Sequence, residues 1–194
     1  MDRQINAAKD CYDRGVTAFN NRDYETAADW FTKAAEQGHA TAQNNLGVCY
    51  ENGYGAAKDP EKAVYWYAKA AEQGNKTAQG NLGYCYQTGS GVALDPEKAV
   101  YWLTKAARQG YATAQCRLAR CYDDGTGVTR SCRKAAYWYK KAARRGNAYA
   151  QYSLGVCYKY GDGVLKNLKK AVYWFKKAAE QGDVDAKYQV ELLT

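Results

Sequence analysis

The chain has 194 residues, of which 46% are hydrophobic and 25% charged, and its formal net charge is +8 at pH 7. No stretch approaches the roughly 18–20 consecutive apolar residues that a membrane helix needs. The opening MDRQINAAKD also lacks the apolar segment of a signal peptide. We therefore expect a soluble, cytoplasmic protein that does not contact a membrane, unless a leader preceded Met1 and was removed.

The chain is organised as a repeat. AADWFTKAAEQG at 27–38 returns as AVYWYAKAAEQG at 63–74, and three further copies begin at residues 99, 135 and 171, always 36 residues apart. A fixed period of this length indicates a repeat architecture, in which each unit buries its apolar face against its neighbours. We predict a single repeat domain over 1–194, with the following units: 1–39, 40–75, 76–111, 112–147, 148–183 and a terminal capping helix at 184–194.

One unit, 40–75, predicts a pair of antiparallel helices. Ala42, Leu46 and Tyr50 share one helical face, and the glycines of NGYGAAK then end that helix. Asp59-Pro60 starts a second helix as N-cap and first helical residue, and Gly74 ends it. Its apolar stripe is formed by Ala63, Trp66, Tyr67 and Ala70. The first unit has a shorter turn between its two helices.

These motifs resemble a known family. The succession AxAQxxLGxxY, GxGV and KAxxWxxKAAxQG is similar to the Sel-one-like repeat, a relative of the tetratricopeptide repeat, and the first unit is closer to the tetratricopeptide spacing. The resemblance implies an all-α, right-handed superhelical solenoid of stacked antiparallel helix pairs, with the first helices lining a concave groove. It also implies an adaptor or scaffold without chemistry. Cysteines that are stapled together in secreted bacterial members are replaced here by Ala71, Ala107 and Ala143.

The seven cysteines favour reduced thiols, because their number is odd and none forms a CxxC pair. Four of them recur at one repeat position: Cys49, Cys85, Cys121 and Cys157. Equivalent positions on stacked repeats lie about 10 Å apart, whereas zinc requires sulfurs at about 2.3 Å. We expect these four to act as small core hydrophobes and predict no metal site. Cys116 is expected to face the groove and to be the reactive thiol.

Nothing in the chain predicts an enzyme. His39 is the only histidine, so neither a Ser-His-Asp nor a Cys-His arrangement can form, and it is expected to be a turn residue. Asp123 and Asp124 point about 100° apart on a helix, so they do not form a carboxylate pair. The GTG and GDG loops lack the lysine and helix context of a phosphate-binding loop. No cofactor and no small-molecule substrate is predicted.

A binding site is expected where one helical face varies between repeats. On the first helices the leucine at position 46 and the tyrosine at position 50 recur in each copy, but the positions equivalent to 41, 44, 48 and 52 change. The predicted groove residues are Arg117, Arg120, Tyr149, Tyr152, Lys159, Tyr160 and Tyr188, with Tyr84 and, in a smaller N-terminal part, Tyr12 and Phe19. Tyrosine and arginine are frequent interface anchors. A protein or peptide partner, with acidic or aromatic side chains, is expected to bind there.

The uneven distribution of charge leaves a second function open. Residues 112–147 carry nine Lys or Arg against two Asp or Glu, whereas residues 1–39 carry five against seven. The alternative to a protein-interaction scaffold is therefore polyanion or nucleic-acid binding by residues 112–183. The outer face of the second helices carries a Tyr–Lys pair in four repeats, which we interpret as a solvated helix surface: Tyr65–Lys69, Tyr101–Lys105, Tyr137–Lys141 and Tyr173–Lys177.

Overall fold

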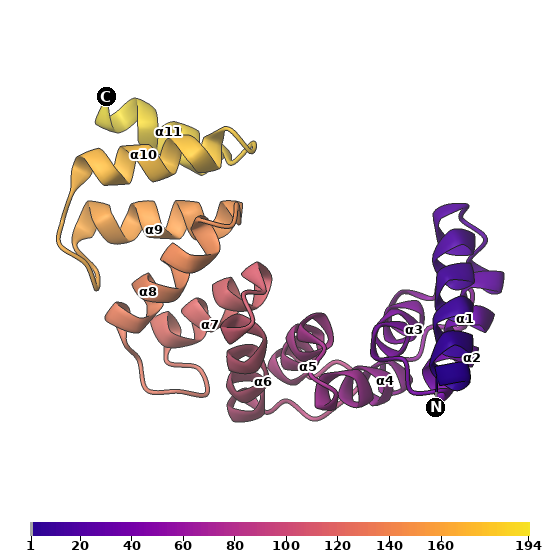
Figure 1. The fold of residues 1–194 in the computed structure, drawn as a ribbon. Helices are drawn as coiled ribbons and strands as arrows, with labels where there is room; N and C mark the ends of the chain where they lie inside the picture. Colours follow the sequence, from indigo (N-terminus) through magenta and orange to yellow (C-terminus); the bar gives the residue numbers. More distant parts are fainter. Residues whose placement is uncertain (1) are drawn as a thin grey trace. The chain divides into compact units, whose positions relative to one another are not determined.

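The computed structural model describes residues 2–194, with side chains from Ala7 onward, and this part of the chain consists of α-helices joined by turns, without a strand (Figure 1). The all-α prediction is confirmed. In chain order the helices are α1 (Asp2–Asn20), α2 (Tyr24–Glu36), α3 (Ala40–Asn52), α4 (Pro60–Glu72), α5 (Lys76–Thr88), α6 (Pro96–Arg108), α7 (Ala112–Asp124), α8 (Cys132–Ala143), α9 (Ala148–Tyr160), α10 (Leu168–Ala179) and α11 (Val184–Leu193).

The helices form two compact units, residues 1–95 and 96–194. In the N-terminal unit α1 packs on α2 and α3 on α4, and each pair contacts the first helix of the next repeat. In the C-terminal unit α7 packs on α8 and α9 on α10, and α11 lies against α10 (Figure 1). Consecutive helix pairs therefore pack as the repeat pattern predicts.

Helix boundaries follow the predicted capping residues. The Asp59 carboxylate accepts a hydrogen bond from the Lys62 backbone N–H at 3.0 Å, and Pro60 is the first residue of α4. α3 ends at Asn52, and the following Gly53 has a φ of 78°, a left-handed conformation that glycine adopts without strain. Gly55 is required for a different reason, because a Cβ there would collide with the Tyr24 carbonyl of the preceding repeat.

The core is built from one large side chain on each second helix and, on α3, α5, α7 and α9, one buried leucine. The position after each tryptophan is at most 2% exposed in all five repeats: Phe31, Tyr67, Leu103, Tyr139 and Phe175. A Cβ added at Gly47 would lie 2.6 Å from the Tyr67 ring, so this glycine lets the two helices approach closely. Trp66 is only half-buried and packs at the edge of the core.

In four repeats a buried glutamine ties the first helix to the repeat before it. The Gln43 side-chain amide donates to the Ala35 carbonyl at 3.0 Å, and the same bond recurs in three later repeats: Gln79 to Ala71, Gln115 to Ala107 and Gln151 to Ala143. All four glutamines are at most 5% exposed. A buried amide must find partners for its N–H groups and for its oxygen, because leaving either unbonded costs about 1–3 kcal/mol.

The cysteines behave as core residues rather than as ligands. All seven are free thiols, and the four in register, Cys49, Cys85, Cys121 and Cys157, are buried as predicted. Burial raises the pKa of Cys49 to about 11 and that of Cys157 to about 12. The expectation for Cys116 is wrong, since this side chain is 6% exposed and burial raises its pKa to about 11. Its side chain belongs to the buried cluster of the C-terminal unit, together with Tyr139 and Leu154.

Among the described residues, no helix combines the length and the apolar character that crossing a bilayer requires. Within those same residues, no group of three or more His, Cys, Asp or Glu side chains could hold a metal ion.

Candidate functional site

The first-helix face of the C-terminal unit, meaning the outward side of α7, α9 and α11, carries most of the predicted groove residues. Arg117 and Arg120 lie on α7, and Tyr188 on α11. The α9 helix contributes four side chains: Tyr149, Tyr152, Lys159 and Tyr160. Tyr149, Tyr160 and Tyr188 are 50%, 63% and 61% exposed. This unit therefore presents large aromatic surfaces that its own core does not use.

Two contacts organise this face. The Arg120 guanidinium lies 5.6 Å from the centroid of the Tyr149 ring, a cation–π geometry that joins α7 to α9. The Lys159 ammonium donates a hydrogen bond to the Gln189 side-chain oxygen at 2.7 Å, which joins α9 to α11, and it also lies 5.2 Å from the Tyr160 ring centroid. Side chains from three successive first helices are thus held beside one another. Arg117 is half-buried next to them.

Tyr152 differs from its neighbours because it supports the core. It is half-buried, and its ring centroid lies 5.6 Å from that of the fully buried Phe175. Burial, and then the carboxylates of Asp185 and Asp183, raise the pKa of the Tyr152 phenol. The predicted groove residue Tyr152 therefore also packs against the core, and truncating it would disturb both packing and the face.

The N-terminal unit forms a different feature, a cavity of about 300 Å³ between α1, α2 and α3. Its walls include Tyr12, Val16 and Phe19 of α1, Phe31 of α2 and Val48 of α3. Tyr12 and Phe19 approach the Phe31 ring with centroid distances of 6.2 and 6.3 Å. The predicted N-terminal groove residues therefore line a hollow rather than a projecting surface.

His39 packs against Tyr12, one of the residues that line this cavity. Its ring stacks on Tyr12 with centroids 4.6 Å apart, and its Nδ1 accepts a hydrogen bond from the Ala42 backbone N–H at 3.1 Å. This is the N-cap of α3, so the prediction of a turn residue is confirmed. Desolvation by burial lowers the pKa of His39, with an opposing contribution from Asp13. The remaining predicted residue, Tyr84, is half-buried on α5.

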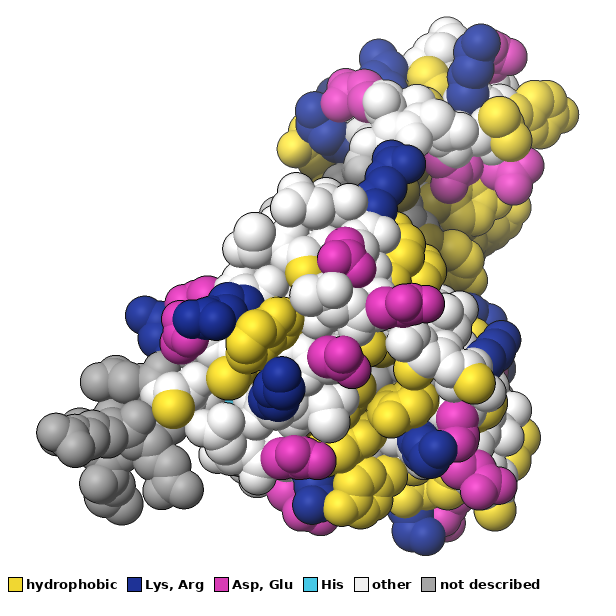
Figure 2. All heavy atoms as spheres, turned by 90° about the vertical axis from the view of Figure 1, so that its right-hand side faces the viewer, with side chains coloured by type: hydrophobic (Ala, Val, Ile, Leu, Met, Phe, Trp, Pro, Cys, Tyr) yellow, Lys and Arg dark blue, Asp and Glu magenta, His cyan; other side chains and the backbone are white. Residues whose placement is uncertain are grey.

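The outer face of the second helices has the predicted packing of lysine on tyrosine. The ammonium groups of Lys69, Lys105 and Lys141 lie 4.7, 4.5 and 5.0 Å from the ring centroids of the tyrosines four residues earlier. In repeat 148–183 Lys177 forms an ion pair with Glu180 at 2.8 Å. Figure 2 shows that on the N-terminal end of the molecule acidic and basic side chains are interspersed, without a large area of one sign.

Sequence reasoning missed part of the N-terminal cavity. Phe31 and Asn45 belong to its walls. In the sequence Phe31 has the pattern of a core residue, and Asn45 lies next to the variable positions 44 and 48. The available signal was the variation at the Asn45 position itself, which reads Asn45, Asn81, Arg117, Ser153 and Gln189. This position varies as much between repeats as the positions equivalent to 41, 44, 48 and 52, on which the groove prediction rests.

Comparisons with known proteins agree with the helix-pair geometry. A protective antigen of uropathogenic Escherichia coli strains with an SLR fold has a TM-score of 0.89 and 39% identity, over 94% of this chain and 40% of that one. A Sel1 repeat protein from Oxalobacter formigenes has a TM-score of 0.82 and 37% identity, over 88% and 49%. The cysteine-rich protein B of Helicobacter pylori has a TM-score of 0.53 and 32% identity, over 66% and 92%.

This chain spans less than half the length of the first two of these proteins. Comparison with curated protein sequences finds no match. The family model described as Sel1 repeat matches residues 4–39, 40–75, 77–111, 112–147 and 148–183, which is nearly the whole chain. The chain therefore belongs to the Sel1 repeat family.

Proposed function

We propose that this chain is a non-enzymatic scaffold that binds a peptide or a partner domain on its first-helix face. Sel1 repeat proteins generally mediate protein–protein interactions and are generally non-catalytic scaffolds. The observation that carries the proposal for this chain is the exposure of Arg120, Tyr149 and Tyr160 on adjoining helices, at positions where the repeats differ.

The chemistry of this face favours a partner segment with carboxylate and aromatic groups. Arg120 would form charge-assisted hydrogen bonds to a carboxylate, because its guanidinium presents two parallel donors. Tyr149 and Tyr160 would supply rigid apolar area with a polar tip, which limits the entropy lost on binding. Lys159 would contribute attraction at the rim, where charges affect the association rate more than the affinity.

The test compares two double variants in the C-terminal unit. Arg120→Ala with Tyr160→Ala removes two groups of the first-helix face, and Tyr101→Ala with Lys105→Ala removes an outer-face pair whose cation–π distance is 4.5 Å. Proteins retained from native lysate by each variant and by the unmodified chain are quantified by mass spectrometry. The affinity of a retained partner is then measured with purified components.

We expect the Arg120→Ala, Tyr160→Ala variant to bind that partner about 30-fold or more weakly, which corresponds to a loss of at least about 2 kcal/mol in binding free energy. The outer-face pair should leave affinity within about threefold, since rim and non-contact residues contribute little. Loss of binding with the outer-face pair alone would overturn the assignment.

Polyanion binding by residues 112–183 is the competing outcome. A partner held by counterion release loses affinity by about 10³–10⁵ between 50 and 200 mM salt when six to ten phosphates are contacted. A random oligonucleotide that binds tightly with this salt dependence, with no protein partner sensitive to Arg120, would replace the scaffold proposal.

A further inference from the structure

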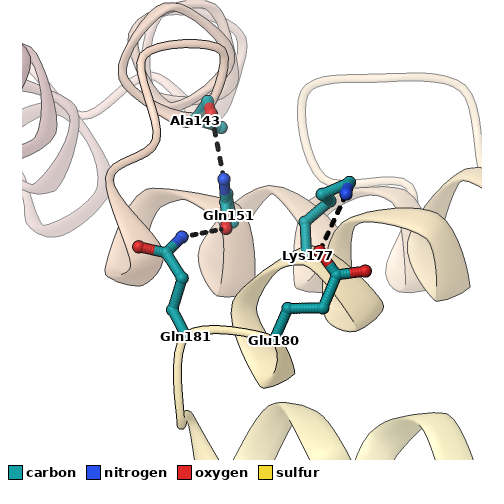
Figure 3. A network of polar contacts seen from close by, with 5 residues as sticks. All are labelled: Ala143, Gln151, Lys177, Glu180 and Gln181. Atoms are coloured by element: carbon teal, nitrogen blue, oxygen red, sulfur yellow. Dashed lines mark hydrogen bonds and ion pairs between the residues drawn. The ribbon is translucent and has the colours of Figure 1, made fainter.

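A second glutamine, from the end of the second helix, bonds the buried glutamine of the same repeat. In 40–75 the Gln73 amide donates to the Gln43 side-chain oxygen at 2.7 Å, and in 148–183 Gln181 donates to Gln151 at 2.7 Å. Figure 3 shows the second case, in which Gln151 bridges the Ala143 carbonyl and the Gln181 amide. Both polar ends of the buried amide are thereby bonded.

Repeat 112–147 breaks this pair. The position of Gln73 and Gln181 is occupied there by Arg145. Gln115 still donates to the Ala107 carbonyl at 3.0 Å, but its side-chain oxygen is buried without a hydrogen-bond partner, and the residue is 2% exposed. The Arg145 guanidinium lies against Gly110 instead, since a Cβ at Gly110 would be 2.8 Å from its Nη2 atom.

The orphaned oxygen belongs to a residue that lines a cavity of about 380 Å³ within the C-terminal unit. The charged residues of its wall are all basic: Arg108, Lys141, Arg144 and Arg145. Two of them also depart from the repeat pattern. Arg108 and Arg144 occupy the position that is glutamate in the other copies, namely Glu36, Glu72 and Glu180. Three substitutions toward arginine therefore lie in the wall of the cavity that Gln115 also lines, and among the described side chains the Gln115 oxygen is the buried acceptor without a donor.

We propose that this cavity binds a phosphate monoester whose carrier presents an N–H or O–H group to the Gln115 side-chain oxygen. A single carboxylate would leave most of the wall charge unmatched. A phosphate monoester carries about −1.5 to −2 charges at pH 7 and three strong acceptor oxygens, and arginine matches it with two parallel donors. The donor on the carrier is the backbone N–H beside a phosphorylated side chain or the hydroxyl of a sugar phosphate.

This inference is independent of the first-helix face, because none of the cavity residues belongs to that face. The decisive variant is Arg145→Gln, which restores the residue found in the other repeats. It removes one cation from the cavity and supplies an amide that can donate to Gln115, as Gln181 does to Gln151. The matched control is Lys140→Gln, which makes the same charge change on α8 at a position that does not line the cavity.

Binding is measured by calorimetry on the full chain with a blocked phosphoserine tripeptide, its unphosphorylated form, ribose 5-phosphate and inorganic phosphate. We expect saturable binding of a phosphorylated probe, and the preference between peptide and sugar phosphate identifies the source of the carrier. Arg145→Gln should weaken it by about tenfold or more, the loss typical of a charge-assisted hydrogen bond. Lys140→Gln should stay within about twofold, the screened effect of one distant charge.

Thermal melting supplies a second readout without ligand. Arg145→Gln should raise Tm by about 2–4 °C, because a buried acceptor gains its donor. Equal weakening by Arg145→Gln and Lys140→Gln would overturn the proposal, since that pattern is general charge attraction. The proposal would also be overturned if no phosphorylated probe showed saturable binding. Equal affinity for inorganic phosphate and for both carriers would overturn it as well, because the contact with Gln115 would then contribute nothing to binding.

Discussion

The two units use the same helix pair to build different surfaces. In the N-terminal unit Tyr12 and Phe19 line an apolar cavity of about 300 Å³ and approach the buried Phe31. In the C-terminal unit Arg120 and Tyr160 stand on the outward side of the first helices, and Tyr160 is 63% exposed. The same class of variable position thus gives a hollow in one unit and a projecting basic and aromatic face in the other.

The difference shows what the repeat fixes and what it leaves open. The large residue after each tryptophan is buried in every helix pair, and four of the five pairs add a buried leucine from the first helix. At positions on the border of this core, the length of the side chain determines whether the surface is hollow or projects. Short residues such as Val16 and Val48 leave a cavity, whereas Arg120 and Tyr149 extend past the core and meet each other.

The largest expected effect tests whether the N-terminal cavity wall is core. Phe31→Ala should lower the free energy of unfolding by about 3–5 kcal/mol, because it removes a fully buried ring beside an existing cavity. Tyr160→Ala should change it by no more than about 0.5 kcal/mol, as for other surface sites. Urea denaturation measures both. Equal losses would show that the two surfaces do not differ in the way proposed.

Filling the cavity sharpens the comparison. Val48→Phe places a ring in the hollow and should raise the free energy of unfolding by about 0.5–2 kcal/mol. Val156 occupies the equivalent position in the C-terminal unit, and Val156→Phe should stay within about 0.5 kcal/mol as a substitution at a half-exposed site. Thermal melts of both variants give the answer, and a matching gain at Val156 would contradict a cavity confined to the N-terminal unit.

The two units should also respond differently to mild acid. Burial lowers the pKa of His39 in the folded state below the value of about 6.5 expected when unfolded. The neutral ring is therefore favoured by folding, so its contribution is present above about pH 6.5 and is lost as pH falls through the folded pKa. Protonation of Nδ1 would also abolish the N-cap bond, which is worth about 1 kcal/mol.

His39→Asn should flatten this dependence between about pH 7.5 and 5 while keeping a cap, because Asn147 caps α9 in the same way. The reverse variant, Asn147→His, should bring pH dependence into the C-terminal unit. Denaturant midpoints across this pH range are the measurement. A steep pH dependence that survives in His39→Asn would place its origin elsewhere.

The smallest effect concerns Asp123 in the C-terminal unit. Burial and the neighbouring Asp124 raise the pKa of the Asp123 carboxyl. A raised folded pKa favours the protonated form, so this contribution to stability is present below the unfolded value of about 3.9 and is lost as pH rises through the folded pKa. Asp123→Asn should therefore be slightly more stable than the unmodified chain at neutral pH. Asp124→Asn should lower the Asp123 pKa in a carbon-detected NMR titration, and an unchanged value would contradict this cause.

Much of the molecule could be predicted from local sequence. The Asp59-Pro60 start of α4 and the glycine end of α3 follow from capping chemistry, which depends on a few neighbouring residues. Other features could not, because they depend on contacts between repeats. Cys116 and Tyr152 share a repeat position that was assigned to the groove, yet Cys116 is buried and Tyr152 rests on Phe175. A helical wheel gives the direction in which a side chain points, but it does not show which neighbouring helix covers that side chain.

The sequence by itself determined the repeat length, the helix pairs, their caps and the all-α class, since period and turn chemistry act over short range. Only the tertiary structure decided which variable side chains remain exposed and which polar groups lack a partner. The change from glutamine to Arg145 is visible in the sequence, but its consequence is an unbonded Gln115 oxygen at a residue 30 positions away. Burial and hydrogen-bond satisfaction are set by residues that are distant along the chain and adjacent in space.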